Sequence, residues 1–154
     1  MAVRIAICLG ILLAFGGAAA AQEPSAEPEP ILETGELMVM VIKPAYDELQ
    51  RAIATPPVDR QQWAQLYQKA ARLAEFENLI LFRPHERSDK PEWKSLATNA
   101  RKATATVASL TLKALANAQG ANFDDIRKAY EDVSGRCNAC HRAMSREAPT
   151  IRPD

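Results

Sequence analysis

The stretch FDDIRKAYEDVSGRCNACHRAM, residues 123 to 144, has an apolar residue at every third or fourth position. These positions are Phe123, Ile126, Tyr130, Val133, Cys137, Cys140 and Met144. Steps of three and four place side chains on one face of an α-helix, which turns once in about 3.6 residues. The stretch therefore predicts an amphipathic helix whose apolar face packs against other helices.

The preceding sequence repeats this pattern in three more segments. Residues 93 to 114 contain a second apolar seam, made of Trp93, Leu96, Ala100, Ala103, Val107, Leu110 and Ala114. Breaks at TPP (55–57), RPHERSDKP (83–91) and AQGAN (118–122) separate the segments, and capping residues precede three of them: Asp59, Asp89 and Asn122. Gly120 marks the end of the third segment. Short connections and no strand-like alternation predict an all-α protein, an antiparallel up-and-down four-helix bundle.

The amino-terminal residues have a different composition. MAVR is positively charged, an apolar run follows, and Ala19, Ala20 and Ala21 supply small residues for a signal peptidase. The run is shorter than the roughly 20 residues of a spanning helix, so residues 1–21 are predicted to be a cleaved signal peptide rather than a membrane anchor. QEPSAEPEP, residues 22–30, predicts a flexible tether, and residues 31–154 are predicted to form the domain. The predicted location is the periplasm, with no integral membrane segment after cleavage.

Composition limits the classes of partner. A chain of 154 residues with 47% hydrophobic content can bury one core of ordinary size, which predicts one domain. Lys plus Arg and Asp plus Glu are 19 each. This balance gives no indication of a nucleic acid or an anionic membrane as partner.

Cys137, Cys140 and His141 form a Cys-x-x-Cys-His motif within the final helical segment. Two thiols one helical turn apart can bond the two vinyl groups of a haem, while the adjacent histidine reaches the iron. The motif therefore predicts one covalently attached haem c on the C-terminal helix. Cys8 is removed with the signal, so these are the cysteines of the mature chain.

The two cysteines also suit other uses. A disulfide or a thioredoxin-type redox pair is compatible with an oxidising compartment, but the redox pair expects a βαβ setting. A helical binding module with a disulfide and no haem is a related alternative. Structural zinc needs four ligands, and the remaining candidate, His85, is distant in the sequence.

With CNACH on the last helix of a bundle, the sequence resembles the class II c-type cytochromes, the family that includes cytochrome c prime. The resemblance covers the chain from about Ile31 onward, with a weaker likeness in ELMVMVIKP, residues 36–44. It implies that Cys137 and Cys140 carry the thioethers and that His141 is the proximal iron ligand. It also implies that the residue facing the other side of the iron comes from the first helix.

Two methionines of the first helix are candidates for that distal position. Met38 lies on an apolar stripe with Val41, Ala45, Leu49 and Ala52, whereas Met40 aligns with Lys43, Pro44 and Asp47. Met38 is therefore the predicted distal ligand, although a methionine on such a stripe also suits plain packing. Pro44 is expected to kink the helix nearby, and His85 in a polar break is the alternative ligand.

Two functions follow from these ligands. With Met38 bound, the protein is a periplasmic carrier of single electrons, not an enzyme, that exchanges electrons with redox partner proteins. Without it, an open five-coordinate haem binds small gases, NO or CO. An acid, Glu36, stands where cytochrome c prime commonly has a basic residue before the distal position, which counts against the open site.

Three arginines lie near the motif: Arg136, Arg142 and Arg146. Their positive charges suit haem propionates, an acidic partner protein or the carboxyl end of the helix dipole. The resemblance also allows a homodimer.

Overall fold

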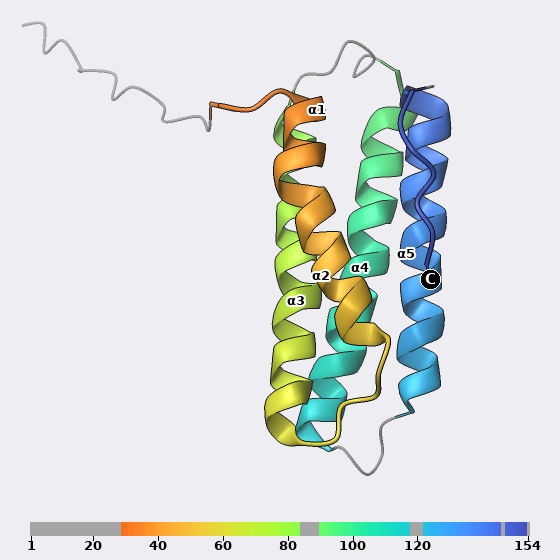
Figure 1. Cartoon of the computed structure of the whole chain (residues 1–154). Helices are drawn as coiled ribbons and strands as arrows, with labels where there is room; N and C mark the ends of the chain where they lie inside the picture. Colours follow the sequence, from red (N-terminus) through yellow and green to blue (C-terminus); the bar gives the residue numbers. More distant parts are fainter. Residues whose placement is uncertain (1–28, 84–89, 118–121, 146, 154) are drawn as a thin grey trace, which may run out of the picture.

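The computed structural model describes residues 29–83, 90–117, 122–145 and 147–153. In this part of the chain all regular structure is helical and no strand is present. The helices are α1 (Thr34–Leu37), α2 (Lys43–Ile53), α3 (Arg60–Asn78), α4 (Glu92–Ala116) and α5 (Phe123–Met144). A π-helical turn, Met38–Ile42, joins α1 to α2, and a 3-10 turn, Leu79–Phe82, follows α3. Four helical rods thus pack together in a bundle, with α1, the π turn and α2 forming the first (Figure 1).

Two of the predicted helix starts are confirmed by hydrogen bonds. The Asp59 carboxylate accepts from the backbone N–H of Gln62 at 2.7 Å, and α3 begins at the next residue after Asp59. The side chain of Asn122 accepts from the N–H of Asp124 at 3.0 Å at the start of α5. Helix α4 begins at Glu92, whereas the predicted cap Asp89 and the predicted stop Gly120 lie outside the described residues.

The first rod departs from a regular α-helix just before Pro44. Proline has no N–H to give to the carbonyl of Met40, and the N–H of Lys43 bonds to the carbonyl of Met38, five residues back. One extra residue is thereby accommodated in the turn, as in a π-bulge. The sequence predicts a kink near Pro44, and the irregularity that the structure has just before this residue is a π turn.

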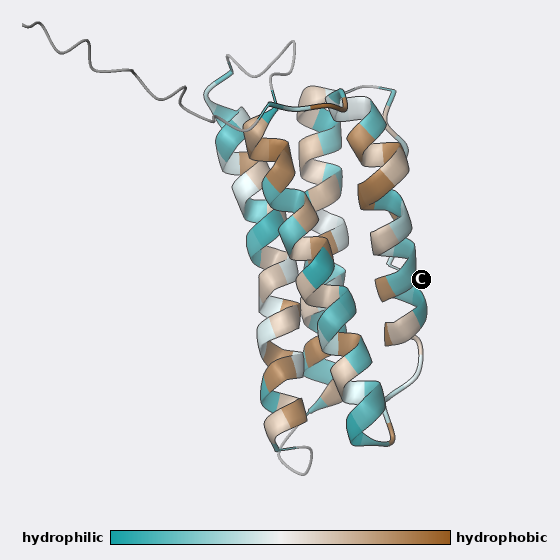
Figure 2. Ribbon diagram, turned by 90° about the vertical axis from the view of Figure 1, so that its left-hand side faces the viewer, coloured by the Kyte–Doolittle hydropathy of each residue, from teal (hydrophilic) through white to brown (hydrophobic). Residues whose placement is uncertain are grey.

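The core lies along the two predicted apolar seams. In α5 the side chains of Ile126, Tyr130, Val133, Cys140 and Met144 are buried, and Phe123 and Cys137 are half-buried. Tyr130 stacks on Tyr46 of α2 with ring centroids 5.6 Å apart, and the Tyr46 hydroxyl hydrogen-bonds the buried Ser134 hydroxyl at 2.7 Å. Figure 2 shows hydrophobic and hydrophilic residues alternating along each helix, as expected when one face is buried.

Two sets of contacts connect the first rod and the residues before it to α3 and the residues after it. Arg72 and Lys69 of α3 both pair with Glu48 of α2, and Arg83 donates from Nε to the carbonyl of Leu32 at 3.0 Å. Helix α4 packs against both α3 and α5. Within the described ranges, no helix combines the length and the apolar composition needed to cross a lipid bilayer. The predicted signal and nearly all of the predicted tether precede the described residues.

Candidate functional site

Helix α5 presents Cys137, Cys140 and His141 near its carboxyl end. Cys140 is buried, with 8% of its surface exposed, while Cys137 and His141 are half-buried. Both cysteines are free thiols, and both pack against the hydrophobic core. The predicted helical spacing is thus present, and the two thiols lie on the inward side of α5.

The surroundings of the thiols hold them in the protonated form. Burial raises the pKa of Cys137 to about 12, and Glu77 and Cys140 act in the same direction. Burial also raises the pKa of Cys140. Cysteines that exchange disulfides generally have a lowered pKa, because the thiolate is the nucleophile. This environment therefore does not favour a thioredoxin-type redox pair.

His141 has a defined partner on one side of its ring. Its Nδ1 lies 2.9 Å from the backbone carbonyl oxygen of Pro149. A carbonyl oxygen can only accept, so Nδ1 must carry the hydrogen, and in a neutral imidazole Nε2 then keeps its lone pair. Metal-ligating histidines in proteins are usually oriented by such a bond from the nitrogen that does not bind the metal. The residues of the motif therefore fit a haem iron.

Glu77 of α3 is a buried acid that the sequence analysis did not single out. Its side chain is 1% exposed, and it accepts a 3.1 Å hydrogen bond from the Thr104 hydroxyl through Oε1, while Oε2 has no hydrogen-bond partner. Burial raises its pKa to about 7, against the opposing effects of Thr104 and Arg101. Its charge also acts on Cys137. The sequence feature that indicates its burial is its spacing, because Glu77 continues the apolar series Leu66, Ala70 and Leu73.

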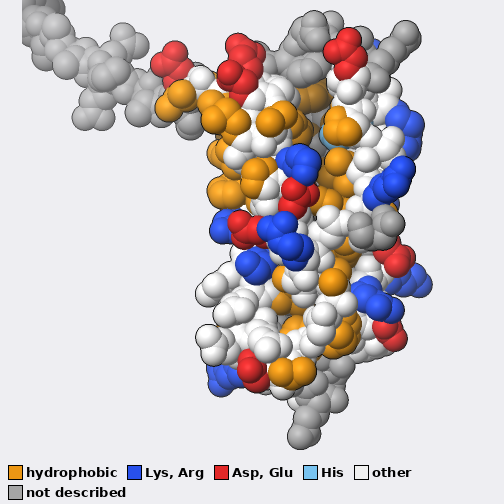
Figure 3. Space-filling model, viewed as in Figure 1, with side chains coloured by type: hydrophobic (Ala, Val, Ile, Leu, Met, Phe, Trp, Pro, Cys, Tyr) orange, Lys and Arg blue, Asp and Glu red, His pale blue; other side chains and the backbone are white. Residues whose placement is uncertain are grey.

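The two candidate methionines point in different directions. Met38 is half-buried and packs against the core, whereas Met40 is 63% exposed. The stripe that separates the two is therefore confirmed, while ligation of iron by Met38 stays a prediction. The π turn that contains both packs on α3. Hydrophobic side chains cluster over this end of the molecule and along the seam where the first rod faces α5 (Figure 3). His85 lies outside the described residues.

The arginines near the motif differ in whether they form an ion pair. Arg136 donates from Nε to the Asp132 carboxylate at 3.0 Å on the same helix. Arg142 is exposed, and Arg146 lies outside the described residues. Arg136 is thus already paired, which leaves Arg142 as the exposed basic side chain directly beside His141.

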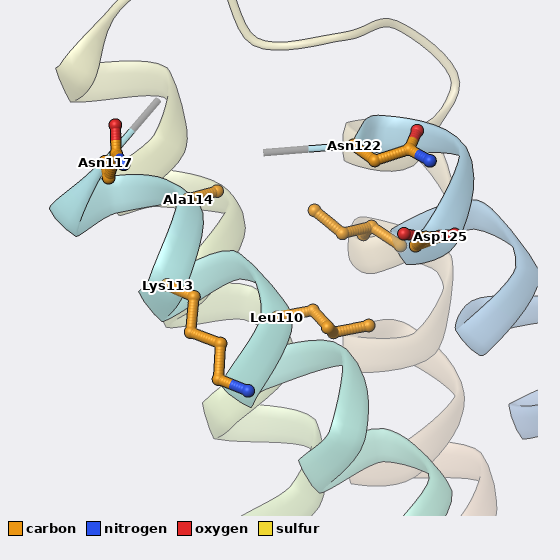
Figure 4. A pocket seen from close by; sticks show the side chains of 7 residues that line it. Leu110, Lys113, Ala114, Asn117, Asn122 and Asp125 are labelled. Carbon is orange, nitrogen blue, oxygen red and sulfur yellow. The ribbon is translucent and has the colours of Figure 1, made fainter. Parts of the chain in front are cut away.

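A pocket lies at the other end of α5 (Figure 4). Its lining includes Lys113 of α4, Asn117 directly after α4, Asn122 directly before α5, and Asp125 and Ile126 of α5. Of the residues that line this pocket, Ile126 is the nearest to the motif along the chain. At a rise of about 1.5 Å per residue, Ile126 and Cys137 are about 16 Å apart along the helix axis. The pocket is therefore separate from the Cys-x-x-Cys-His motif.

In the parts of the chain that the structure describes, no three His, Cys, Asp or Glu side chains converge on a point that could hold a metal ion. Comparisons with protein-family models, curated proteins and solved structures found no match to the chain.

Proposed function

We propose that the protein is a class II c-type cytochrome that carries single electrons and catalyses no reaction of its own. Cys137 and Cys140 form the thioether links to one haem, and His141 binds the iron through Nε2. Met38 is the ligand on the opposite side. Residues 1–21 direct export to the periplasm, where redox partner proteins exchange electrons with it. A haem bound here supplies reversible one-electron chemistry at its iron.

The observation that carries the proposal is the hydrogen bond between His141 Nδ1 and the Pro149 carbonyl, at 2.9 Å. It assigns the proton to Nδ1 and leaves Nε2 as the nitrogen able to bind iron. The two thiols are on the same helix at the spacing that haem attachment needs. Their raised pKa values disfavour the competing thiol chemistry.

The proposal includes an antiparallel up-and-down arrangement of the four rods. Its support comes from contacts that join the first rod, or the residues just before it, to α3 or the residues just after it. Leu32 meets Arg83, and Glu48 meets Arg72 and Lys69, so sequence numbers rise along one rod as they fall along the other. Short connections between rods that are neighbours in the sequence agree with this topology.

Met38 is preferred as the distal ligand on the basis of its burial. It packs against the core from the first rod, whereas Met40 is largely exposed. A thioether is a neutral, soft ligand that raises the reduction potential relative to a second histidine. This pair of ligands would suit an electron carrier, because an iron held by both His141 and Met38 would leave no site for other ligands.

The first test is the absorption spectrum of the protein expressed with its signal and a haem-attachment system. The oxidised, reduced and carbon-monoxide-treated forms are compared. We expect a covalently bound haem with a low-spin spectrum that carbon monoxide leaves unchanged. A high-spin spectrum that shifts with the gas would instead establish the open, gas-binding site. Absence of covalent haem would refute the assignment as a cytochrome and would favour the helical binding module without haem.

Substitutions in the same assay test the two axial residues. Met38→Ala should convert the low-spin iron to a high-spin form that binds carbon monoxide. Met40→Ala is the matched control and should leave the spectrum unchanged, because its side chain is exposed. The opposite result would reverse the assignment. His141→Ala should disturb the spectrum of both oxidation states, since the proximal ligand is lost.

A further inference from the structure

The carboxyl-terminal residues form a strap on α5. Residues 147–153, here called the C-terminal strap, run back along α5 toward its middle (Figure 1). Asn138 holds the strap by two hydrogen bonds to one residue. Its Nδ2 donates to the Ile151 carbonyl at 2.8 Å, and its Oδ1 accepts from the Ile151 N–H at 2.8 Å. The paired bonds fix both the position and the direction of the strap at this point.

Further contacts attach the strap to the first rod. The Tyr46 hydroxyl donates to the Arg152 carbonyl at 3.0 Å, and Gln50 donates to the same oxygen at 3.3 Å. The Ile151 side chain packs against the core. The strap is therefore held on both α5 and α2, and Asn138, which holds it on α5, lies within the Cys-x-x-Cys-His motif.

The strap also carries the partner of the predicted iron ligand. Pro149, two residues before Ile151, provides the carbonyl that lies 2.9 Å from His141 Nδ1. Asn138 and His141 are three residues apart and share a face of α5. The strap thus crosses this face of α5 with one residue fixed by Asn138 and another bonded to His141.

We propose that Asn138 is a positioning residue for the iron ligand. By fixing Ile151 it holds the Pro149 carbonyl against His141 Nδ1, which sets the orientation and basicity of the imidazole. This inference rests on the proposed function. It gives a role to one of the two residues between the cysteines, which haem attachment itself leaves unspecified.

The expected effect on the iron has a definite sign. An Nδ1–H bond to a carbonyl makes the imidazole a stronger donor through Nε2. A stronger donor favours the ferric over the ferrous iron, because the ferric ion has the greater positive charge. Loss of the bond should therefore raise the reduction potential. It should also lower the iron–histidine stretching frequency in the ferrous protein when the opposite position is vacant.

The test uses the haem-loaded full chain and Asn138→Ala. Amide hydrogen exchange at Ile151 reports on the strap, and loss of its acceptor should speed that exchange about fivefold to tenfold. The reduction potential should rise in the same variant. In the Met38→Ala background, Asn138→Ala should lower the iron–histidine frequency measured by resonance Raman spectroscopy.

Two further variants complete the design. Deletion of residues 149–154 removes the acceptor itself and should shift the potential in the same direction as Asn138→Ala. Asn99→Ala changes an exposed asparagine of α4 and should leave all three readouts at their wild-type values. If the Ile151 amide exchanges faster but the potential and the frequency stay unchanged, the strap does not position His141 and the inference is wrong.

The outcomes separate this inference from the proposed function. A wild-type protein without covalent haem, or with haem whose spectrum is insensitive to His141→Ala, overturns both. A His141-ligated haem whose potential is insensitive to Asn138→Ala and to the deletion overturns only the role of Asn138.

Discussion

The stability of the protein should fall as the pH rises toward neutrality, because Glu77 is buried. The carboxyl group is 1% exposed and its pKa is raised from 4.5 to about 7, chiefly by burial. The folded state therefore binds the proton more tightly than the unfolded state. The stabilisation from this proton is complete below pH 4.5 and is lost as the pH rises through about 7.

The size of the effect follows from the shift. One pKa unit corresponds to about 1.4 kcal/mol, so the shift of Glu77 corresponds to about 3 kcal/mol of unfolding free energy between the two limits. Glu77→Gln removes the titrating group and keeps an oxygen to accept from Thr104. We expect this variant to be more stable than the wild type at about pH 8. Its unfolding free energy should also fall much less than that of the wild type as the pH rises to that value.

The measurement is urea unfolding followed by circular dichroism at about pH 5 and about pH 8. Glu131→Gln is the matched control, because Glu131 is an exposed acid on α5. It should retain the wild-type difference between the two pH values. If Glu77→Gln keeps that difference too, the carboxyl group is not the source of the pH dependence and the reasoning from its burial fails.

Three other substitutions test the packing of the bundle by urea unfolding. Asp59→Ala removes the cap of α3 and should lower the unfolding free energy by about 1 kcal/mol; no change would mean that the cap is dispensable. Tyr46→Phe leaves the buried Ser134 hydroxyl without its partner and should cost about 1–3 kcal/mol; a neutral result would indicate that water replaces the bond. Leu49→Ala should cost about 2–5 kcal/mol, since Leu49 has no exposed surface, and a cost near zero would place Leu49 outside the core.

The helices could be predicted from local sequence because their signals are short-range. Apolar steps of three and four identified both long seams, and the caps Asp59 and Asn122 lie where predicted. The same periodicity distinguished Met38 from Met40. The form of the irregularity before Pro44 was harder to predict, since a missing N–H can be accommodated by a kink or by a π turn.

The chemistry around the motif depends on residues that the sequence does not place together. In the sequence, Glu77 differs from other helical acids only in its position on the apolar stripe of its helix. Its surroundings depend on the packing of α4, which places Thr104 and Arg101 beside it. The residues after Met144 carry no periodic pattern. Nothing in their composition indicates that Pro149 meets His141 or that Ile151 meets Asn138.

The sequence by itself determined the helices, their inward faces and the Cys-x-x-Cys-His spacing on one of them. These features depend on residues within a few positions of one another, so helical geometry alone relates them. The tertiary structure decided which polar groups are buried and which partners they find, such as Tyr46 with the carbonyl of Arg152. Those contacts join residues distant in the chain, and they form when the apolar faces of the helices pack together and exclude water.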